Sequence, residues 1–263
     1  MMPARKEREQ MRQEIATYSR QLMLSSAIAE RCATDATPLQ EQFLHQVLSE
    51  EISRRERNKR ARLLKRAGFP VLKSFSEYEF SGIRFPPDLA KDELLSCQFI
   101  AEKQNLVLYG GVGTGKTHMS LALGIAACEM GLKVRFYTVT ELVLKLADTY
   151  RAGTLERLVR DLKQLDLLIL DEWGYVPVDR EGSQLLFRVI ADSYESKSLI
   201  LTTNLEFSKW GSVFTDEQMA AAMIDRLVHH GHLLMFESKS YRMTHALMRH
   251  QPATTIEPDK EPS

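Results

Sequence analysis

Eight consecutive residues have types and a spacing suited to binding the phosphate groups of a nucleotide. They fit the pattern G-x-x-x-x-G-K-[ST] and are Gly110, Gly111, Val112, Gly113, Thr114, Gly115, Lys116 and Thr117. In such a loop the glycines let backbone N–H groups converge on the α- and β-phosphates, the lysine reaches the β- and γ-oxygens, and the threonine hydroxyl can ligate Mg²⁺. We therefore predict an ATP and Mg²⁺ site, with His118, at the start of the following helix-like run, as a further contact.

Two adjacent carboxylates end an apolar, strand-like segment further along the chain. The segment is Leu167 to Leu170, and the carboxylates are Asp171 and Glu172. Ligands of open α/β sheets bind outside the carboxyl ends of the strands, so Asp171 is expected beside the phosphate loop, where it can hold Mg²⁺ directly or through water. Glu172 is placed to polarise an attacking water. Alone, such carboxylates commonly begin a loop, but downstream of a phosphate loop they indicate a Walker B strand.

The next apolar strand ends in an amide side chain, Asn204. This residue can orient the hydrolytic water beside Glu172, and the two together favour hydrolysis over phosphoryl transfer to a metabolite. Asparagine is also a common turn residue, which is the competing interpretation.

Two arginines downstream complete the predicted constellation. Arg226, late in a helix-like run, is of the kind presented to a neighbouring subunit's γ-phosphate, where such a finger accelerates hydrolysis by roughly 10³- to 10⁵-fold. Arg242, after the last strand, is expected to contact the nucleotide within its own subunit. The competing interpretation for Arg226 is an ion pair with Asp216 or Asp225, and the alternative fingers are Arg180 and Arg188.

Strand-like and helix-like runs alternate from Leu106 onward, which predicts a parallel sheet covered by helices on both faces. The expected strands are Leu106 to Tyr109, Lys133 to Val139, Leu167 to Asp171, Ser198 to Thr203 and His232 to Glu237. The expected helices are Lys116 to Met130, Thr140 to Tyr150, Leu155 to Gln164, Ser183 to Ser196 and Asp216 to His230.

A helical region precedes this part of the chain. We predict one helix over Met11 to Ala33 and a second, capped by Thr37, that ends at Ala67 before Gly68 and Pro70. The predicted domains are therefore residues 1–67, a small all-α domain, and residues 68–250, the ATPase domain. We expect residues 251–263 to form a polar, disordered tail. Aromatic rings between Gly68 and Pro87 are expected to pack on the ATPase domain, with base stacking as the alternative.

The charge distribution separates the two domains. Residues 1–66 carry 14 Lys and Arg against 9 Asp and Glu, whereas the rest of the chain carries 21 against 26. At about 100° per residue, Arg55, Lys59, Arg62 and Arg66 lie within about 60° of one another on a helix, a stripe that could follow a phosphate backbone. A solvated helix face is the alternative, but such faces normally mix the two signs. We predict DNA contacts, with little base readout, by Arg54, Arg55, Lys59, Arg60, Arg62 and Arg66.

Composition excludes several classes of protein. No apolar stretch reaches membrane-spanning length and the charged N-terminus is unlike a signal peptide, so we expect a cytoplasmic protein without a membrane partner. Three widely spaced cysteines suggest neither a disulfide framework nor a zinc site.

The chain resembles the IstB family of AAA+ ATPases, which assist insertion-sequence transposases, from about Leu22 to His250. The resemblance rests on the basic helical segment with Gly68-Phe69-Pro70, the phosphate loop Gly110 to Thr117, Asp171-Glu172, Thr202-Thr203-Asn204, Asp225-Arg226-Leu227 and Ser240-Tyr241-Arg242. It implies an α/β fold: a P-loop AAA+ domain of the ASCE type, with a parallel five-stranded sheet between helices and a small all-α N-terminal domain.

The resemblance also implies a function. It suggests an ATPase that forms homo-oligomers on double-stranded DNA, bends that DNA, and recruits and activates a partner transposase. DnaC-type helicase loaders share the ATPase motifs and are the nearest alternative, although the total length and the lack of a long lid after Arg242 favour IstB. An architectural DNA-binding protein that uses ATP only for assembly is the alternative outside the enzymes.

Overall fold

The computed structural model describes residues 5–76, 78–174, 179–212, 214, 216–238 and 240–241. The chain divides into two compact units, Met1–Lys65 and Arg66–Ser263. The predicted tail, residues 251–263, lies outside the described residues.

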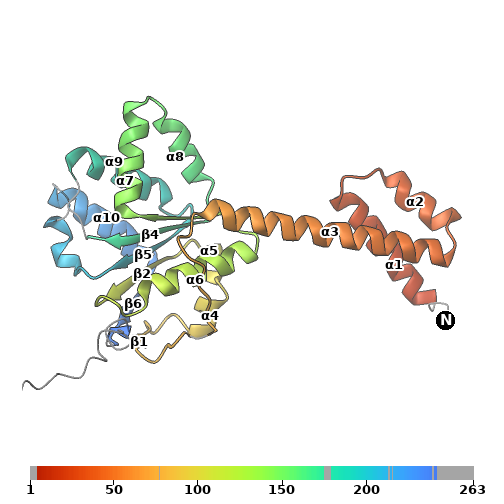
Figure 1. The fold of residues 1–263 in the computed structure, drawn as a ribbon, viewed down its shortest axis with the longest axis horizontal. Helices are drawn as coiled ribbons and strands as arrows, with labels where there is room; N and C mark the ends of the chain where they lie inside the picture. Colours follow the sequence, from red (N-terminus) through yellow and green to blue (C-terminus); the bar gives the residue numbers. More distant parts are fainter. Residues whose placement is uncertain are drawn as a thin grey trace, which may run out of the picture. The chain divides into compact units, whose positions relative to one another are not determined.

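The first unit consists of α1 (Arg5–Gln21), α2 (Ser26–Asp35) and most of α3 (Pro38–Ala67), labelled in Figure 1. Its small core contains Ile15, Leu22, Cys32 and Leu48. A buried carboxylate adds a polar clamp, because Glu41 of α3 accepts hydrogen bonds from Arg8 at 2.9 Å and from Arg12 at 2.7 Å, both on α1. These two hydrogen-bonded arginines lower the pKa of Glu41. The clamp ties α1 to α3 where few apolar side chains are available.

The prediction of one helix over Met11 to Ala33 is wrong, because the chain turns between α1 and α2. Met23 adopts a left-handed conformation with φ of 58°, and the Ser25 hydroxyl caps α2 by accepting from the N–H of Ala27. The turn brings Leu22 and Cys32 into the same core, so tertiary burial and a local cap together override the helix-forming composition.

Helix α3 ends where the sequence predicts. At its start, the side chain of Gln40 accepts the N–H of Thr37 at 2.9 Å, and after its last residue Gly68 has φ of 79°. The carbonyl of Arg66, the first residue of the second unit, accepts a hydrogen bond from the Arg135 guanidinium of that same unit.

The second unit is built on a sheet with the strand order β1-β6-β2-β5-β4-β3. The strands are β1 (Ile83–Arg84), β2 (Asn105–Gly110), β3 (Val134–Thr138), β4 (Leu167–Trp173), β5 (Ser198–Thr203) and β6 (Gly231–Phe236). All neighbouring strands are parallel except β1, which runs antiparallel to β6.

The α/β P-loop fold class is confirmed, but within the described residues the sheet has six strands and not the predicted five. The five predicted strands are all present, and the additional strand is β1. Its two residues are too few to show any periodicity, and it is fixed by pairing with β6 and by an ion pair of 2.9 Å between Arg84 and Glu237.

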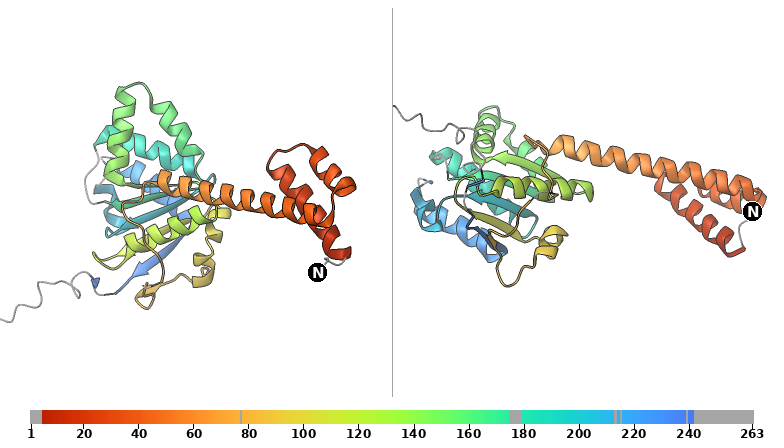
Figure 2. Two further views of the ribbon diagram at one scale, coloured as in Figure 1. Left: turned by 45° about the vertical axis from the view of Figure 1, so that its right-hand side comes forward. Right: turned by 60° about the horizontal axis from the view of Figure 1, so that its bottom comes forward.

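Helices cover both faces of the sheet (Figure 1, Figure 2). One face carries α6 (Lys116–Glu129) with the short α4 (Lys91–Leu95) and α5 (Gln98–Ala101). The other carries α7 (Val139–Arg151), α8 (Leu155–Lys163), α9 (Arg180–Ser193) and α10 (Glu217–His229), with the 3₁₀ helix η1 (Phe207–Ser212) before α10. Among the described residues, no helix has the length and apolar character needed to cross a bilayer.

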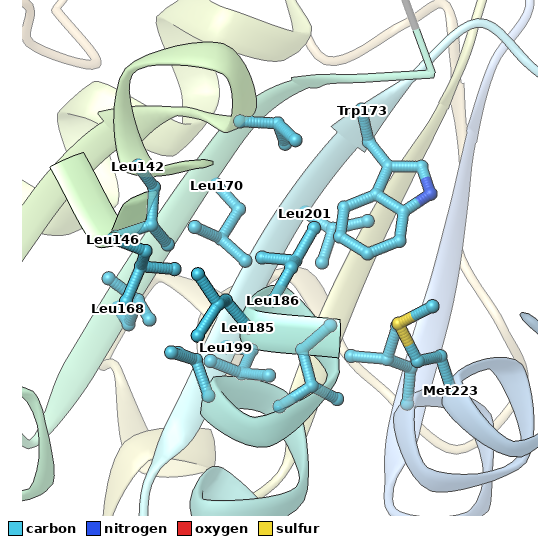
Figure 3. Packing of buried hydrophobic residues seen from close by; sticks show 14 of the residues in the cluster. Leu142, Leu146, Leu168, Leu170, Trp173, Leu185, Leu186, Leu199, Leu201 and Met223 are labelled. Carbon is cyan, nitrogen blue, oxygen red and sulfur yellow. The ribbon is translucent and has the colours of Figure 1, made fainter. Parts of the chain in front are cut away.

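The larger core lies between the sheet and α7 to α10 (Figure 3). Leucines of β4 and β5 meet leucines of α7 and α9 there, as the nearly continuous apolar runs of a two-sided parallel strand predict. Trp173, the last residue of β4, is fully buried and lies 4.9 Å from Trp210 of η1, measured between ring centroids. This packing fixes the end of β4 that carries the predicted metal ligand Asp171 and the predicted catalytic residue Glu172.

Candidate functional site

The phosphate loop joins the carboxyl end of β2 to the start of α6, as predicted. Gly115 is the N-cap of α6, so the loop leads directly into a helix N-terminus, whose unpaired N–H groups and dipole favour anions. The buried Lys116 side chain folds over the loop, and its Nζ donates to the carbonyl oxygens of Gly110 at 2.8 Å and Gly111 at 2.6 Å. Val112, at the outside of the loop, is exposed.

The loop is in close contact with the segment that follows β6. The N–H of Tyr241 donates to the carbonyl of Gly113 at 3.0 Å. Gly113 has φ of 78°, and a Cβ atom at this position would lie 2.2 Å from Oγ of Ser240. Only glycine fits here, for reasons of both backbone conformation and space.

The connector before the sheet holds the other end of the loop. The Tyr78 hydroxyl donates to the carbonyl of Gly115 at 3.1 Å, and burial raises the pKa of Tyr78 well above its usual range. His118 was predicted as a nucleotide contact. Its ring packs against that of Tyr78, with 4.9 Å between the ring centroids, and its Nε2 lies 2.8 Å from the carbonyl oxygen of Ser74. These contacts are ring packing within the second unit, which is one of the two interpretations of the connector's rings.

The two predicted Mg²⁺ ligands lie side by side. The Thr117 hydroxyl donates to Oδ1 of Asp171 at 3.1 Å, and the buried Asp171 carboxylate also accepts a hydrogen bond from the Thr202 hydroxyl of β5. Oxygen ligands of this kind are those that Mg²⁺ takes in nucleotide sites, where it usually keeps one or two protein ligands with phosphates and waters. The donor set therefore fits the ion.

Glu172 occupies a bulge in β4. Leu170 pairs with Leu201 and Trp173 pairs with Thr203, so the strand register shifts between them. Glu172 has φ of 62°, a left-handed conformation that costs a non-glycine residue about 1–2 kcal/mol. The burial of Trp173 and the hydrogen bond from the Glu172 N–H to Thr202 Oγ1 at 3.1 Å hold this conformation. The prediction that β4 ends at Asp171 is therefore wrong, because the strand continues through the bulge.

Asn204 directly follows β5, next to the Thr203 that pairs with Trp173. Glu172 and Asn204 thus flank one strand pair at the carboxyl edge of the sheet, and both side chains are exposed. In the part of the chain that the structure describes, neither side chain has a hydrogen bond or ion pair. Both are accessible to a water at this edge.

Arg226 lies at the other end of the central strand. Its backbone carbonyl is 3.5 Å from Nδ2 of Asn105, the first residue of β2, whereas the phosphate loop begins at the last. Five residue steps separate these ends, which is about 17 Å in a strand. The Arg226 guanidinium donates to the carbonyl of Ala222 at 2.9 Å and lies 5.2 Å from the Phe187 ring centre. The competing ion pair with Asp216 or Asp225 is absent among the described residues.

The alternative arginines differ in their surroundings. Arg188 makes two hydrogen bonds of 2.8 Å to the carboxylate of Glu156, so its guanidinium is already engaged within the chain. Arg180 is exposed in the first turn of α9. Arg242 lies outside the described residues.

The predicted DNA contacts are exposed on α3. Arg54, Arg55, Lys59, Arg60, Arg62 and Arg66 all present accessible side chains. Within the described residues, Arg55 is the one member of this group in an ion pair, with Glu51 at 2.8 Å. Most of the positive charge is therefore not neutralised within the helix.

Three contacts of the site were not predicted from the sequence: the hydroxyl of Thr202 on Asp171, that of Tyr78 on Gly115, and Ser240 against Gly113. For the Thr202 contact the sequence does contain a signal, because Thr202 is a polar residue that directly follows the apolar run Leu199 to Leu201. No local pattern indicates the other two, because each joins segments far apart in the chain.

Sequence comparisons relate this arrangement to known proteins. The family model described as IstB-like ATP binding protein matches residues 20–248. The insertion sequence IS21 putative ATP-binding protein of Pseudomonas aeruginosa is 36% identical over 205 residues, covering 77% of this chain and 76% of that protein. The insertion sequence IS5376 putative ATP-binding protein of Geobacillus stearothermophilus is 34% identical over 239 residues, covering 89% and 95%.

Among solved structures, the crystal structure of DnaI has a TM-score of 0.50 to this chain, at 16% sequence identity. The match covers 62% of this chain and 90% of that one. At this identity the likeness concerns the fold alone.

Proposed function

The chain belongs to the IstB-like ATP-binding family, and from this premise we propose that it is an ATPase that assembles on duplex DNA, bends it and recruits a partner transposase. The observation that carries the hydrolytic part is the contact of Thr117 with Asp171, with Glu172 one residue further on the same sheet edge. It supports an ATP site with a carboxylate available to activate water.

Binding and chemistry are divided among these residues. The phosphates of ATP replace the carbonyls of Gly110 and Gly111 as partners of Lys116, while loop N–H groups and the start of α6 hold the β-phosphate. Mg²⁺, held by Thr117 and Asp171, would neutralise charge on the β- and γ-oxygens. Glu172 accepts the proton of the attacking water, and Asn204 orients that water beside it.

Arg226 acts in trans in this proposal. Its position near the first residue of β2, about 17 Å along the strand from its own phosphate loop, favours contact with the γ-phosphate of a neighbouring copy. Hydrolysis then depends on assembly, since the arginine finger reaches the site only in an oligomer. Arg242 would contact the nucleotide in its own subunit.

A hydrolysis experiment with two variants tests this division. Glu172→Gln should retain ATP and DNA binding but stop turnover, so that assemblies persist on DNA; Arg226→Ala should also stop hydrolysis and spare ATP binding. Mixing the two should restore activity, because one interface then combines an intact glutamate with an intact arginine. Arg188→Ala is the matched control and should hydrolyse ATP normally, since its guanidinium is bound to Glu156. No recovery on mixing would contradict action in trans.

DNA binding is proposed for the exposed basic stripe of α3. The uncompensated charges support contact with phosphates, and each contact should contribute about −0.9 to the slope of log affinity against log salt. Arg55→Gln with Arg62→Gln should reduce the magnitude of that slope by about 2 for each subunit bound to the DNA. Arg57→Gln with Lys65→Gln removes the same charge from outside the stripe and should change the slope less. Affinity that does not depend on salt would contradict the proposal.

The partner separates this function from the nearest alternative. The printed names of the matching relatives, which describe ATP-binding proteins of insertion sequences, support a transposase. A helicase loader would instead bind a replicative helicase and not duplex DNA. Imaging the chain with duplex DNA and a slowly hydrolysed ATP analogue distinguishes them, because an ordered oligomer on bent DNA is expected only of the transposition helper.

A further inference from the structure

The bulge in β4 places two residues of that strand opposite one residue of β5. Between the pairs Leu170–Leu201 and Trp173–Thr203, Asp171 and Glu172 both face Thr202. Such a two-to-one arrangement leaves one residue without its regular place in the ladder. Both carboxylates of the proposed hydrolytic site are therefore adjacent to the same threonine.

The Thr202 hydroxyl bonds to both partners at once. It donates its hydrogen to Oδ1 of Asp171 and accepts the backbone N–H of Glu172 at 3.1 Å. A hydroxyl has one hydrogen and two lone pairs, so these two bonds use the donor and one acceptor position. Thr202 is only 2% exposed, and water therefore has little access to replace either bond.

We propose that Thr202 is a positioning residue for ATP hydrolysis, a role that rests on the proposed ATPase function. Its hydroxyl fixes the orientation of the Asp171 carboxylate, which would hold Mg²⁺, and it holds the Glu172 peptide in the left-handed conformation that presents the side chain at the sheet edge. One hydroxyl thereby sets the relative placement of the metal ligand and the general base.

Thr203 does not share this role. Its hydroxyl donates to the carbonyl of Trp173 at 2.9 Å and accepts the N–H of Leu205 at 3.0 Å, so it fixes the strand end and the following turn. Thr202 is thus the side chain of β5 that contacts both Asp171 and Glu172.

The test compares three single variants of the full-length chain. Thr202→Val keeps the shape of the side chain but removes both hydrogen bonds, and Thr202→Ser restores the hydroxyl. Ser198→Ala is the matched control, because Ser198 begins the same strand, is fully buried, and donates its hydroxyl to the carbonyl of Phe99 at 3.1 Å, away from the site. Each variant is measured for kcat, ATP affinity without Mg²⁺, the Mg²⁺ concentration that half-activates hydrolysis, and thermal unfolding.

Thr202→Val should lower kcat by roughly 10- to 100-fold, the range for residues that orient a metal ligand, and raise the half-activating Mg²⁺ concentration. ATP affinity without Mg²⁺ should stay within about twofold, because the loop contacts are intact. Thr202→Ser should recover most of kcat. Ser198→Ala should lose a similar amount of thermal stability and keep its kcat.

Three outcomes would overturn the inference. The first is a folded Thr202→Val chain with parental kcat and Mg²⁺ response, the second is a serine variant as slow as the valine variant, and the third is an equal loss of kcat in Ser198→Ala. In these cases Glu172→Gln would still be inactive and the proposed ATPase function would stand. A parental chain that does not hydrolyse ATP under any assembly condition would overturn both.

Discussion

Replacing Gly113 with alanine tests whether the phosphate loop depends on its contact with the segment after β6. The change has two costs. At φ of 78° a Cβ atom introduces left-handed strain of about 1–2 kcal/mol, and it would also lie 2.2 Å from Oγ and 3.2 Å from Cβ of Ser240. If the loop relaxes when empty and must re-form to bind ATP, the strain alone weakens ATP binding by roughly 5- to 30-fold. The steric overlap adds to that loss.

Two further variants separate strain from overlap. Gly153→Ala introduces the same kind of strain, at φ of 68°, where nothing lies within 4 Å of the new Cβ. It should lower the free energy of unfolding by about 1–2 kcal/mol and leave ATP affinity unchanged. Adding Ser240→Ala to Gly113→Ala removes the Oγ atom and should recover the part of the affinity lost to overlap, but not the part lost to strain.

Titration with a fluorescent ATP analogue, together with thermal unfolding of each variant, gives both quantities. The reasoning is refuted if Gly113→Ala binds ATP like the parent. The part of the reasoning that concerns overlap is refuted if Ser240→Ala recovers no affinity, since Ser240 would then not contribute to restricting this position to glycine.

Three other predictions concern buried titratable groups. Burial lowers the pKa of Lys197 to about 8, below its value in the unfolded chain, so the unfolded state binds more protons between these two pKa values. The free energy of unfolding, measured with urea, should therefore rise by about 2–3 kcal/mol from pH 7 to pH 10, and Lys197→Met should abolish this rise. The pKa of Glu41 is lower in the folded than in the unfolded chain, so its carboxylate stabilises the fold at pH values above the unfolded pKa, and this contribution is lost as the pH falls. The difference in the free energy of unfolding between the parent and Glu41→Gln should therefore shrink from pH 7 to pH 4. Burial raises the pKa of Cys97 and of Cys128 to about 11, which lowers the fraction of reactive thiolate. Labelling of these thiols at pH 8 should therefore be roughly 100-fold slower in the folded than in the urea-unfolded chain. Equal labelling rates would contradict the burial of the two cysteines.

Local signals in the sequence predicted the elements that carry the site. The phosphate loop needs only glycines at set positions between a strand and a helix, and the Walker B strand needs only an apolar run followed by carboxylates. The end of α3 was equally local, because Gly68 and Pro70 act on their immediate neighbours. The predicted helix Met11 to Ala33 was wrong because Ser25 could cap a new helix and the packing of Leu22 with Cys32 required a turn. The predicted helix Ser183 to Ser196 was displaced, because Asp179 caps a helix that spans Arg180–Ser193.

Contacts between segments far apart in the chain could not be predicted from the sequence. β1 is a strand because β6 offers it a partner, and Glu172 is left-handed because Trp173 is buried and Thr202 accepts its N–H. Neither property is encoded in the types of the neighbouring residues.

The sequence by itself therefore predicted the nucleotide chemistry and the alternation of strands and helices from Leu106 onward, since backbone conformation at glycine and apolar periodicity are properties of adjacent residues. The tertiary structure decided how the parts act on one another. It placed Thr117 on Asp171, put one hydroxyl between Asp171 and Glu172, and set Arg226 at the far end of β2 from its own phosphate loop. These relations depend on sheet register and packing, which bring together residues that the chain keeps far apart.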